Sequence, residues 1–103
     1  MLVSAINTVE IHASHGRCSE IGARVPRMLD VLRDTTPCVA YTFAPSNPDE
    51  TSWIVSGYWQ SETQMHAHFS HPELNGFMEL LQSGAISHLH FNSFVVEASE
   101  KAA

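Results

Sequence analysis

The feature of this sequence that most constrains its fold is the order in which two hydrophobic periodicities follow one another. Apolar side chains alternate with a period of two in strands and recur every three to four residues in amphipathic helices. Strand patterns cover residues 2–13, 38–44, 51–60 and 86–97, and helix patterns cover residues 19–33 and, in two parts, 61–83. The order β-α-β-β-α-β predicts an α+β protein of the ferredoxin-like, split βαβ type, in which an antiparallel sheet has helices on one face.

Capping residues predict where the helical segments begin and end. Ser61 to Gln64 fits a capping box at the start of the second helical region. Ser70, with Glu73 three residues later, is expected to cap the second part of that region, and Gly84 is expected to end it. Pro26 lies in the middle of the first helix and predicts a kink there or two shorter helices. In the last helix we expect four side chains to face inward: Leu74, Phe77, Met78 and Leu81.

Length and charge narrow the range of functions. The 103 residues make one domain, which we expect to span residues 1–98, with a C-terminal tail at 99–103. The net charge is −6, and the clustered basic residues that bind phosphates are absent, so we do not expect a nucleic-acid partner. No apolar run reaches the ~20 residues of a membrane span, and no secretory signal is recognisable, so we expect a cytoplasmic protein. Cys18 and Cys38 lie in no metal-ligand or redox spacing and are expected to be free, structural thiols.

Two strands have apolar residues on faces that we expect the helices to leave uncovered. These residues are Leu2 and Ile6 in the first strand and Leu89, Phe91 and Val95 in the last. A large apolar face is unfavourable in water, and a second copy of the chain would bury it. The sequence therefore predicts a homodimer.

Three side chains near one strand-to-helix corner are candidates for a functional site. Asn7 interrupts an apolar strand face, so its amide either holds a ligand oxygen in a cavity, bonds a neighbouring side chain or faces solvent. Trp59 ends its strand where the chain turns, so it either forms a pocket wall or packs in the core. His68 lies in the helix that follows, and an imidazole suits proton transfer at neutral pH, the alternative being a surface histidine.

The other histidines do not form a recognisable metal-ligand pattern. His66 and His68 are two residues apart on a predicted helix, so their side chains diverge. His88 and His90 share one face of a strand and could either ligate a metal or line a polar cavity, but no acidic or cysteine partner accompanies them. The sequence also contains no nucleophile triad and no glycine-rich phosphate loop. We therefore expect neither a metal nor a nucleotide cofactor.

The same strand-to-helix corner resembles the antibiotic biosynthesis monooxygenase family, within the dimeric α+β barrel superfamily. The residues that match are the run Trp59 to Glu62, Ala67 and His68 in the next helix, and Ser70, Pro72 and Phe77. The opening strand at residues 3–11, the run 37–41 before the second strand, and the overall length also agree. The resemblance spans nearly the whole chain. It is moderately specific for the family and weakly specific for any one activity.

The resemblance implies a ferredoxin-like dimer, a dimeric α+β barrel, with a pocket between sheet and helices in each subunit. It implies a small electron-rich aromatic substrate, such as a phenol, quinol or anthrone, and dioxygen as co-substrate without metal or flavin. By position, Asn7 would hold the phenolate or peroxide oxygen, Trp59 would contact the ring and His68 would assist proton transfer. We expect five further residues to contact the substrate: Tyr41, Phe69, Phe77, His88 and His90.

The chain departs from two better-defined branches of that family. Some polyketide-oxidising members have an asparagine where this chain has Val55. Haem-degrading relatives have a tryptophan where His68 falls and an axial histidine near Met78, so haem breakdown is not expected. Two other classes of function stay open because fold does not fix function. One is a non-catalytic module that binds or protects a small molecule, and the other is an isomerase or decarboxylase of the same superfamily.

Overall fold

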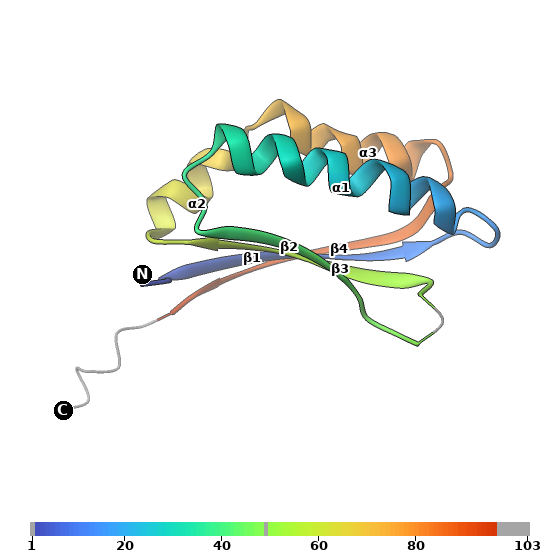
Figure 1. Cartoon of the computed structure of the whole chain (residues 1–103), viewed down its shortest axis with the longest axis horizontal. Coiled ribbons are helices and arrows are strands. Elements are labelled where there is room, and N and C mark those ends of the chain that lie inside the picture. The colour runs from blue at the N-terminus through green and yellow to red at the C-terminus, as the bar shows by residue number, and fades with distance from the viewer. Residues whose placement is uncertain (1, 49, 97–103) are drawn as a thin grey trace.

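A four-stranded antiparallel sheet forms one layer of the protein, and the helices form a second layer on one face of it (Figure 1). The structure is a computed structural model that describes residues 2–48 and 50–96. The elements follow one another as β1 (Ala5–Ala13), α1 (Cys18–Thr35), β2 (Ala40–Pro45), β3 (Ser52–Trp59), α2 (Glu62–His68), a 3-10 turn (Pro72–Leu74), α3 (Asn75–Gln82) and β4 (Ile86–Val95). The strands lie in the order β2-β3-β1-β4. This confirms the α+β, ferredoxin-like fold; the proposed tail at 99–103 lies outside the described residues.

The core lies between the helices and the two central strands. On β1 the buried side chains are every second residue, and β3 contributes its own alternate set in register with them. Helix α1 buries the stripe that the period of 3.6 predicts, which consists of Ile21, Val25, Met28, Leu29 and Leu32. Among the described residues, no helix has both the length and the apolar character required to cross a membrane.

Pro26 does not divide the first helix. Residues Cys18–Thr35 form one α-helix, so of the two expected alternatives, a kink or two shorter helices, the second is wrong. Proline removes the hydrogen bond to the carbonyl of the residue four positions earlier, here Gly22. Both Pro26 and Gly22 are exposed, so water can satisfy that carbonyl and the helix continues.

The second helical region begins as expected but continues with a different cap. The Ser61 hydroxyl accepts a hydrogen bond from the backbone N–H of Gln64 (3.1 Å), which confirms the N-cap. Ser70 does not cap the next segment, because His71 takes that role by accepting from the Glu73 N–H at Nδ1 (3.0 Å). Gly84 follows the last helix with a φ of +89°, a conformation that glycine adopts without strain.

The side chains of β4 face the opposite way from the prediction. In the β1–β4 register Phe91 lies beside Val9 and Leu89 beside Ile11, so both are on the helix side of the sheet. The uncovered face instead presents Phe94, next to Ile6. Phe91 is still 55% exposed, because β4 is an edge strand. Met78 was also expected to face inward, but it is 43% exposed, and Leu80 is buried in α3 instead.

Candidate functional site

The site begins with a row of three residues across the sheet. Tyr41 on β2, Gly57 on β3 and Asn7 on β1 are direct cross-strand neighbours. Gly57 has no side chain, so the tyrosine ring and the asparagine amide meet above it. A Cβ atom at Gly57 would lie 2.4 Å from Asn7 Oδ1 and 2.9 Å from the Tyr41 ring. Glycine is therefore required here by the close approach of its two neighbours.

Four buried side chains are joined by hydrogen bonds above this row. Trp59 Nε1–H donates to Asn7 Oδ1 (2.7 Å), and Asn7 Nδ2–H donates to the Tyr41 hydroxyl (2.9 Å). The Tyr41 hydroxyl lies 2.9 Å from His68 Nε2, and His68 Nδ1 lies 2.6 Å from the Met65 carbonyl oxygen. We call Asn7, Tyr41, Trp59 and His68 the buried polar cluster. It links β1, β2, β3 and α2, and so ties the strand-to-helix corner to the sheet.

The chemistry of its two ends gives the chain of hydrogen bonds one direction. A carbonyl oxygen only accepts, so His68 must be protonated at Nδ1, and its neutral ring then accepts at Nε2. Tyr41 therefore donates its proton to His68 Nε2 and accepts from Asn7. At the other end the indole N–H of Trp59 only donates, which assigns Oδ1 of Asn7 as its acceptor. Every bond in the cluster thus has one donor and one acceptor.

Burial favours the neutral forms of both titratable groups in the cluster. Burial raises the pKa of Tyr41 to about 12, with a smaller opposing effect from the Asn7 hydrogen bond. Burial also lowers the pKa of His68, partly offset by its hydrogen bond to the Met65 carbonyl. At neutral pH the hydroxyl therefore keeps its proton and the imidazole is uncharged. Those two states are the ones that the direction of the hydrogen bonds requires.

The rings of the cluster pack closely against one another. The Trp59 and His68 ring centroids are 4.2 Å apart, and Tyr41 meets Trp59 edge-on at 6.2 Å. Trp59 is 0% exposed, Tyr41 1% and His68 4%. The cluster is thus a packed polar part of the core.

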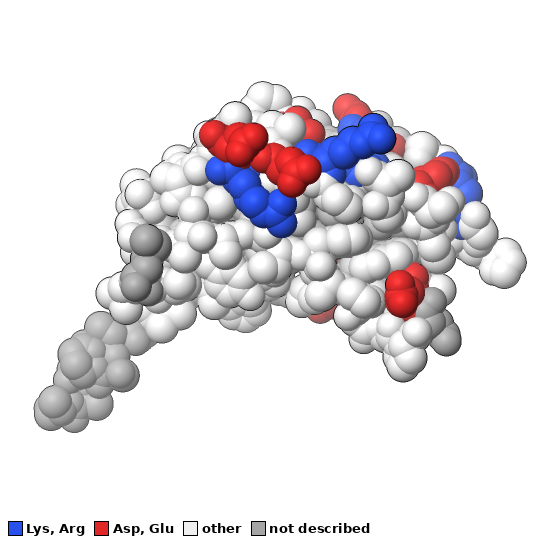
Figure 2. Space-filling view, in the orientation of Figure 1, with Lys and Arg blue, Asp and Glu red and all other residues white. Residues whose placement is uncertain are grey.

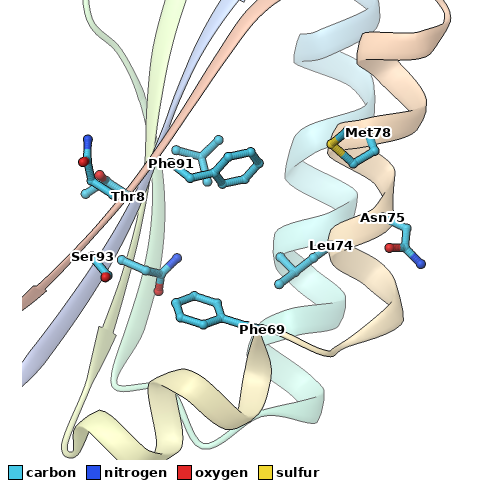
Figure 3. Close-up of a pocket in the computed structure, with 10 residues that line it drawn as sticks. Thr8, Phe69, Leu74, Asn75, Met78, Phe91 and Ser93 are labelled. Carbon is cyan, nitrogen blue, oxygen red and sulfur yellow. The ribbon is translucent and has the colours of Figure 1, made fainter.

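A cavity of about 440 Å³ opens beside the cluster, between the sheet edge and the helical layer. Its volume lies within the usual range for small-molecule sites. Figure 3 shows Phe91 projecting from the sheet toward Met78 and Leu74, with Phe69 closing one end from the C-cap position just after α2. The lining residues are Asn7, Thr8, Val9, Phe69, Leu74, Asn75, Met78, Phe91, Asn92 and Ser93. Phe69, Met78 and Phe91 are each more than 40% exposed, and such a concentration of exposed apolar side chains is typical of a binding surface.

Asn7 is the one member of the buried polar cluster that lines this cavity. Of the other residues expected to contact a substrate, Phe69 lies on the cavity wall and Phe77 is fully buried in the core. His88 and His90 lie in a separate hollow with Glu10 and His12, on the uncovered side of the sheet. The structure therefore joins Asn7, Trp59 and His68, as the sequence analysis expects, but around a packed core and not a hollow.

Several lining residues were not expected from the sequence. The sequence predicts Phe91 on the uncovered face of the sheet, and Leu74 and Met78 on the inward face of the last helix; all three line the cavity. The close packing at Gly57 could have been predicted from the sequence, because an isolated glycine within a strand indicates a close approach by another group. Among residues 2–48 and 50–96, no group of three or more His, Cys, Asp or Glu side chains is placed to hold a metal ion.

Comparison with solved structures places this fold in a known class. A protein from Deinococcus radiodurans, provisionally named an antibiotic biosynthesis monooxygenase, superposes with a TM-score of 0.80 and 14% identity over 91% of this chain and 93% of that one. A protein with the same provisional name from Caulobacter crescentus gives a TM-score of 0.75 and 11% identity over 93% and 92% of the two chains. PA3566 from Pseudomonas aeruginosa gives a TM-score of 0.78 and 12% identity over 95% of this chain and 98% of that one.

At such low sequence identities the likeness shows a shared fold. It therefore confirms the resemblance to antibiotic biosynthesis monooxygenases at the level of the fold. No family model matches the sequence. No curated protein matches it either.

We predict that Gly57→Ala lowers the free energy of unfolding by about 1–3 kcal/mol, the usual cost of overpacking a core. The added Cβ would force Asn7 and Tyr41 apart. The matched control is Gly22→Ala, where a Cβ meets nothing within 4 Å. Alanine is the better helix former, so the control should be neutral or stabilising by up to about 1 kcal/mol. Urea unfolding measures both, and equal stabilities of the two variants would contradict the packing described here.

We also predict that the cluster makes stability depend on pH. Because burial lowers the pKa of His68, the unfolded chain binds more protons than the folded one below the ordinary histidine pKa of about 6.5. The contribution of His68 is therefore complete above about pH 6.5 and is lost as the pH falls. Urea unfolding at about pH 7.5 and pH 5.5 measures the loss, which should be smaller in His68→Gln. An equal loss in both proteins would contradict the buried neutral imidazole.

Proposed function

We propose that this protein is a cofactor-independent monooxygenase that oxidises a small electron-rich aromatic compound, a quinol, phenol or anthrone, with dioxygen. The observation that supports this most is an apolar cavity of about 440 Å³ with the Asn7 amide on its wall. The fold is also that of proteins provisionally named antibiotic biosynthesis monooxygenases.

The proposed reaction requires little from the protein beyond binding and charge stabilisation. A deprotonated phenol, quinol or anthrone gives an electron to dioxygen, and the two radicals then combine. For an anthrone, one oxygen atom becomes the new carbonyl of the substrate, and the other leaves as water with the two hydrogens of the methylene group. The charge that develops on the substrate oxygen needs a hydrogen-bond donor, which Asn7 can supply. Aromatic and thioether groups on the cavity wall would hold the flat ring.

In this proposal Trp59 and His68 act on the substrate through Asn7 and Tyr41. Neither lines the cavity, and both nitrogens of His68 already have partners within the cluster. Any contribution of His68 to proton transfer would therefore pass through the Tyr41 hydroxyl. Phe69, the C-cap residue that follows α2, is the residue at that corner that would contact the ring directly.

One observation favours a second candidate, a module that binds a small aromatic compound without turnover. None of the ten residues that line the cavity is titratable. A general base must reach the proton that it removes, directly or through one water. An isomerase or decarboxylase would need such a base, so the cavity supports that class least. The monooxygenase needs a substrate whose own acidity, aided by Asn7, supplies the anion.

We also propose that the protein is a homodimer that pairs through the uncovered face of the sheet. Figure 2 shows the basic side chains and most of the acidic ones over the helical layer, with a smaller acidic group below it at the lower right. Every described arginine lies in α1 or at its N-cap: Arg17, Arg24, Arg27 and Arg33. On the uncovered face Glu10 is the one formally charged side chain among the described strands. Ile6, Ile54, Tyr58 and Phe94 lie on the same face, and such a surface is suited to self-association.

For activity, we predict that Asn7→Ala lowers the rate of oxygen uptake on reduced naphthoquinols and anthrones by about 100-fold, the usual effect of losing an oxyanion donor. The rate is measured after subtraction of uncatalysed oxidation. Asn47→Ala is the matched control, because Asn47 bonds Thr51 in the β2–β3 loop and does not line the cavity. Ligand-induced thermal stabilisation without oxygen uptake would favour the binding module. Equal rates for wild type and Asn7→Ala would refute the role of Asn7.

For assembly, we predict that the wild type has the mass of a dimer in size-exclusion chromatography with light scattering, and that Phe94→Lys shifts it to monomer. Phe94 is 52% exposed on the uncovered face, so a charge there would be buried in the dimer. Val31→Lys is the control, since Val31 is 38% exposed on α1 in the helical layer. A monomeric wild type, or a dimer that survives Phe94→Lys, would contradict this interface.

A further inference from the structure

The Asn7 amide could in principle present either its oxygen or its nitrogen to the cavity, and the buried polar cluster decides which. Trp59 Nε1–H can only donate, so it fixes Oδ1 of Asn7 as its acceptor at 2.7 Å. Oδ1 is also the atom nearest the position of a Cβ on Gly57, on β3. No residue of β3 lines the cavity, so the oxygen is turned toward the core.

The Tyr41 hydroxyl holds the amide nitrogen of Asn7, and His68 determines that this hydroxyl acts as the acceptor. A hydroxyl can donate or accept, so Tyr41 alone would not choose between the two amide orientations. His68 removes the choice, because its Nδ1–H is held by the Met65 carbonyl and its Nε2 takes the Tyr41 proton. The Tyr41 oxygen is then an acceptor for Asn7 Nδ2 at 2.9 Å.

One of the two side-chain N–H groups of Asn7 has no acceptor in this arrangement. The amide nitrogen has two N–H groups, and Tyr41 accepts from one of them. Among the described residues, the structure gives no second acceptor for Nδ2. Asn7 is only 4% exposed, and the 440 Å³ cavity is the hollow that it lines. The second N–H is thus the group that Asn7 can share with a ligand.

We infer that Tyr41, held by His68, is a positioning residue that makes the cavity selective for a ligand oxygen that accepts a hydrogen bond. The class of ligand is a flat aromatic compound with a carbonyl or phenolate oxygen placed against Asn7. This inference rests on the proposed function and deepens it. A site that offers a donor binds a phenolate better than the neutral phenol, because the anion is the stronger acceptor. Selection of the anion thereby takes the place of a base on the cavity wall.

A matched pair of ligands tests the selectivity directly. 9-Fluorenone and fluorene have the same ring skeleton, and only fluorenone has an acceptor oxygen. The wild type should bind fluorenone about five- to tenfold more tightly, the net effect of one hydrogen bond. Tyr41→Phe keeps the Trp59 bond to Oδ1 but removes the second anchor of the amide. The second N–H is then no longer held toward the cavity, so that ratio should fall, while the Kd for fluorene stays unchanged because the phenyl ring keeps the packing. Tyr58→Phe, on the uncovered face, is the matched control and should keep the ratio.

A spectroscopic signature separates positioning from a merely structural role. In wild type the two Asn7 side-chain N–H resonances should differ, one protected from solvent exchange and one that shifts when fluorenone binds. In Tyr41→Phe the protection should be lost. His68→Leu keeps the Tyr41 hydroxyl but removes its acceptor, so it should also lower the fluorenone preference. It provides the same test if Tyr41→Phe does not fold.

The outcomes distinguish this inference from the proposed function. Fluorenone preference without oxygen uptake on any quinol or anthrone would refute the monooxygenase and leave the positioning role in place. Oxygen uptake together with an unchanged preference in Tyr41→Phe and His68→Leu would refute the positioning role alone. A wild type that binds neither compound, or both equally, would overturn the inferred ligand class.

Discussion

The hydrogen bond from the Trp59 indole to the Asn7 amide is the interaction on which the rest of this site depends. It joins the ends of two neighbouring strands through side chains that are almost fully buried, at 2.7 Å. A buried amide without partners would cost a few kcal/mol, so Asn7 is tolerated in an apolar face only because its oxygen and one N–H are satisfied. Gly57 makes the contact sterically feasible, since any larger residue would occupy the same space.

From that bond the polarity of the whole cluster follows. An indole donates at one end and a backbone carbonyl accepts at the other, so Tyr41 and His68 between them have one consistent arrangement of protons. Such a cluster is rigid, because reversing any one bond would leave a buried donor or acceptor unpaired. The cavity beside it is apolar and has no titratable lining residue. The fold thus places a fixed amide, and no acid or base, against any bound ring.

The sequence alone predicts the order of elements, the core stripe of α1 and the three residues that meet at the strand-to-helix corner. Asn7 is recognisable because it breaks an apolar alternation, and Trp59 and His68 because they flank a capped helix start. That Tyr41 joins them depends on the register that pairs β2, β3 and β1, which is a non-local property. The cavity could not be predicted from the sequence for a related reason. Strand β4 lies at the edge of the sheet, so Phe91 is on the core side and yet exposed.

The central claim is that the buried polar cluster runs in one direction, and the tautomer of His68 tests it most directly. Long-range ¹H–¹⁵N correlation spectra on the neutral protein distinguish a protonated from an unprotonated ring nitrogen. The account predicts a proton on Nδ1 and a free lone pair on Nε2, because Nδ1 faces the Met65 carbonyl at 2.6 Å. A proton on Nε2 would contradict it, since Tyr41 would then accept twice and its own proton would have no acceptor in the cluster.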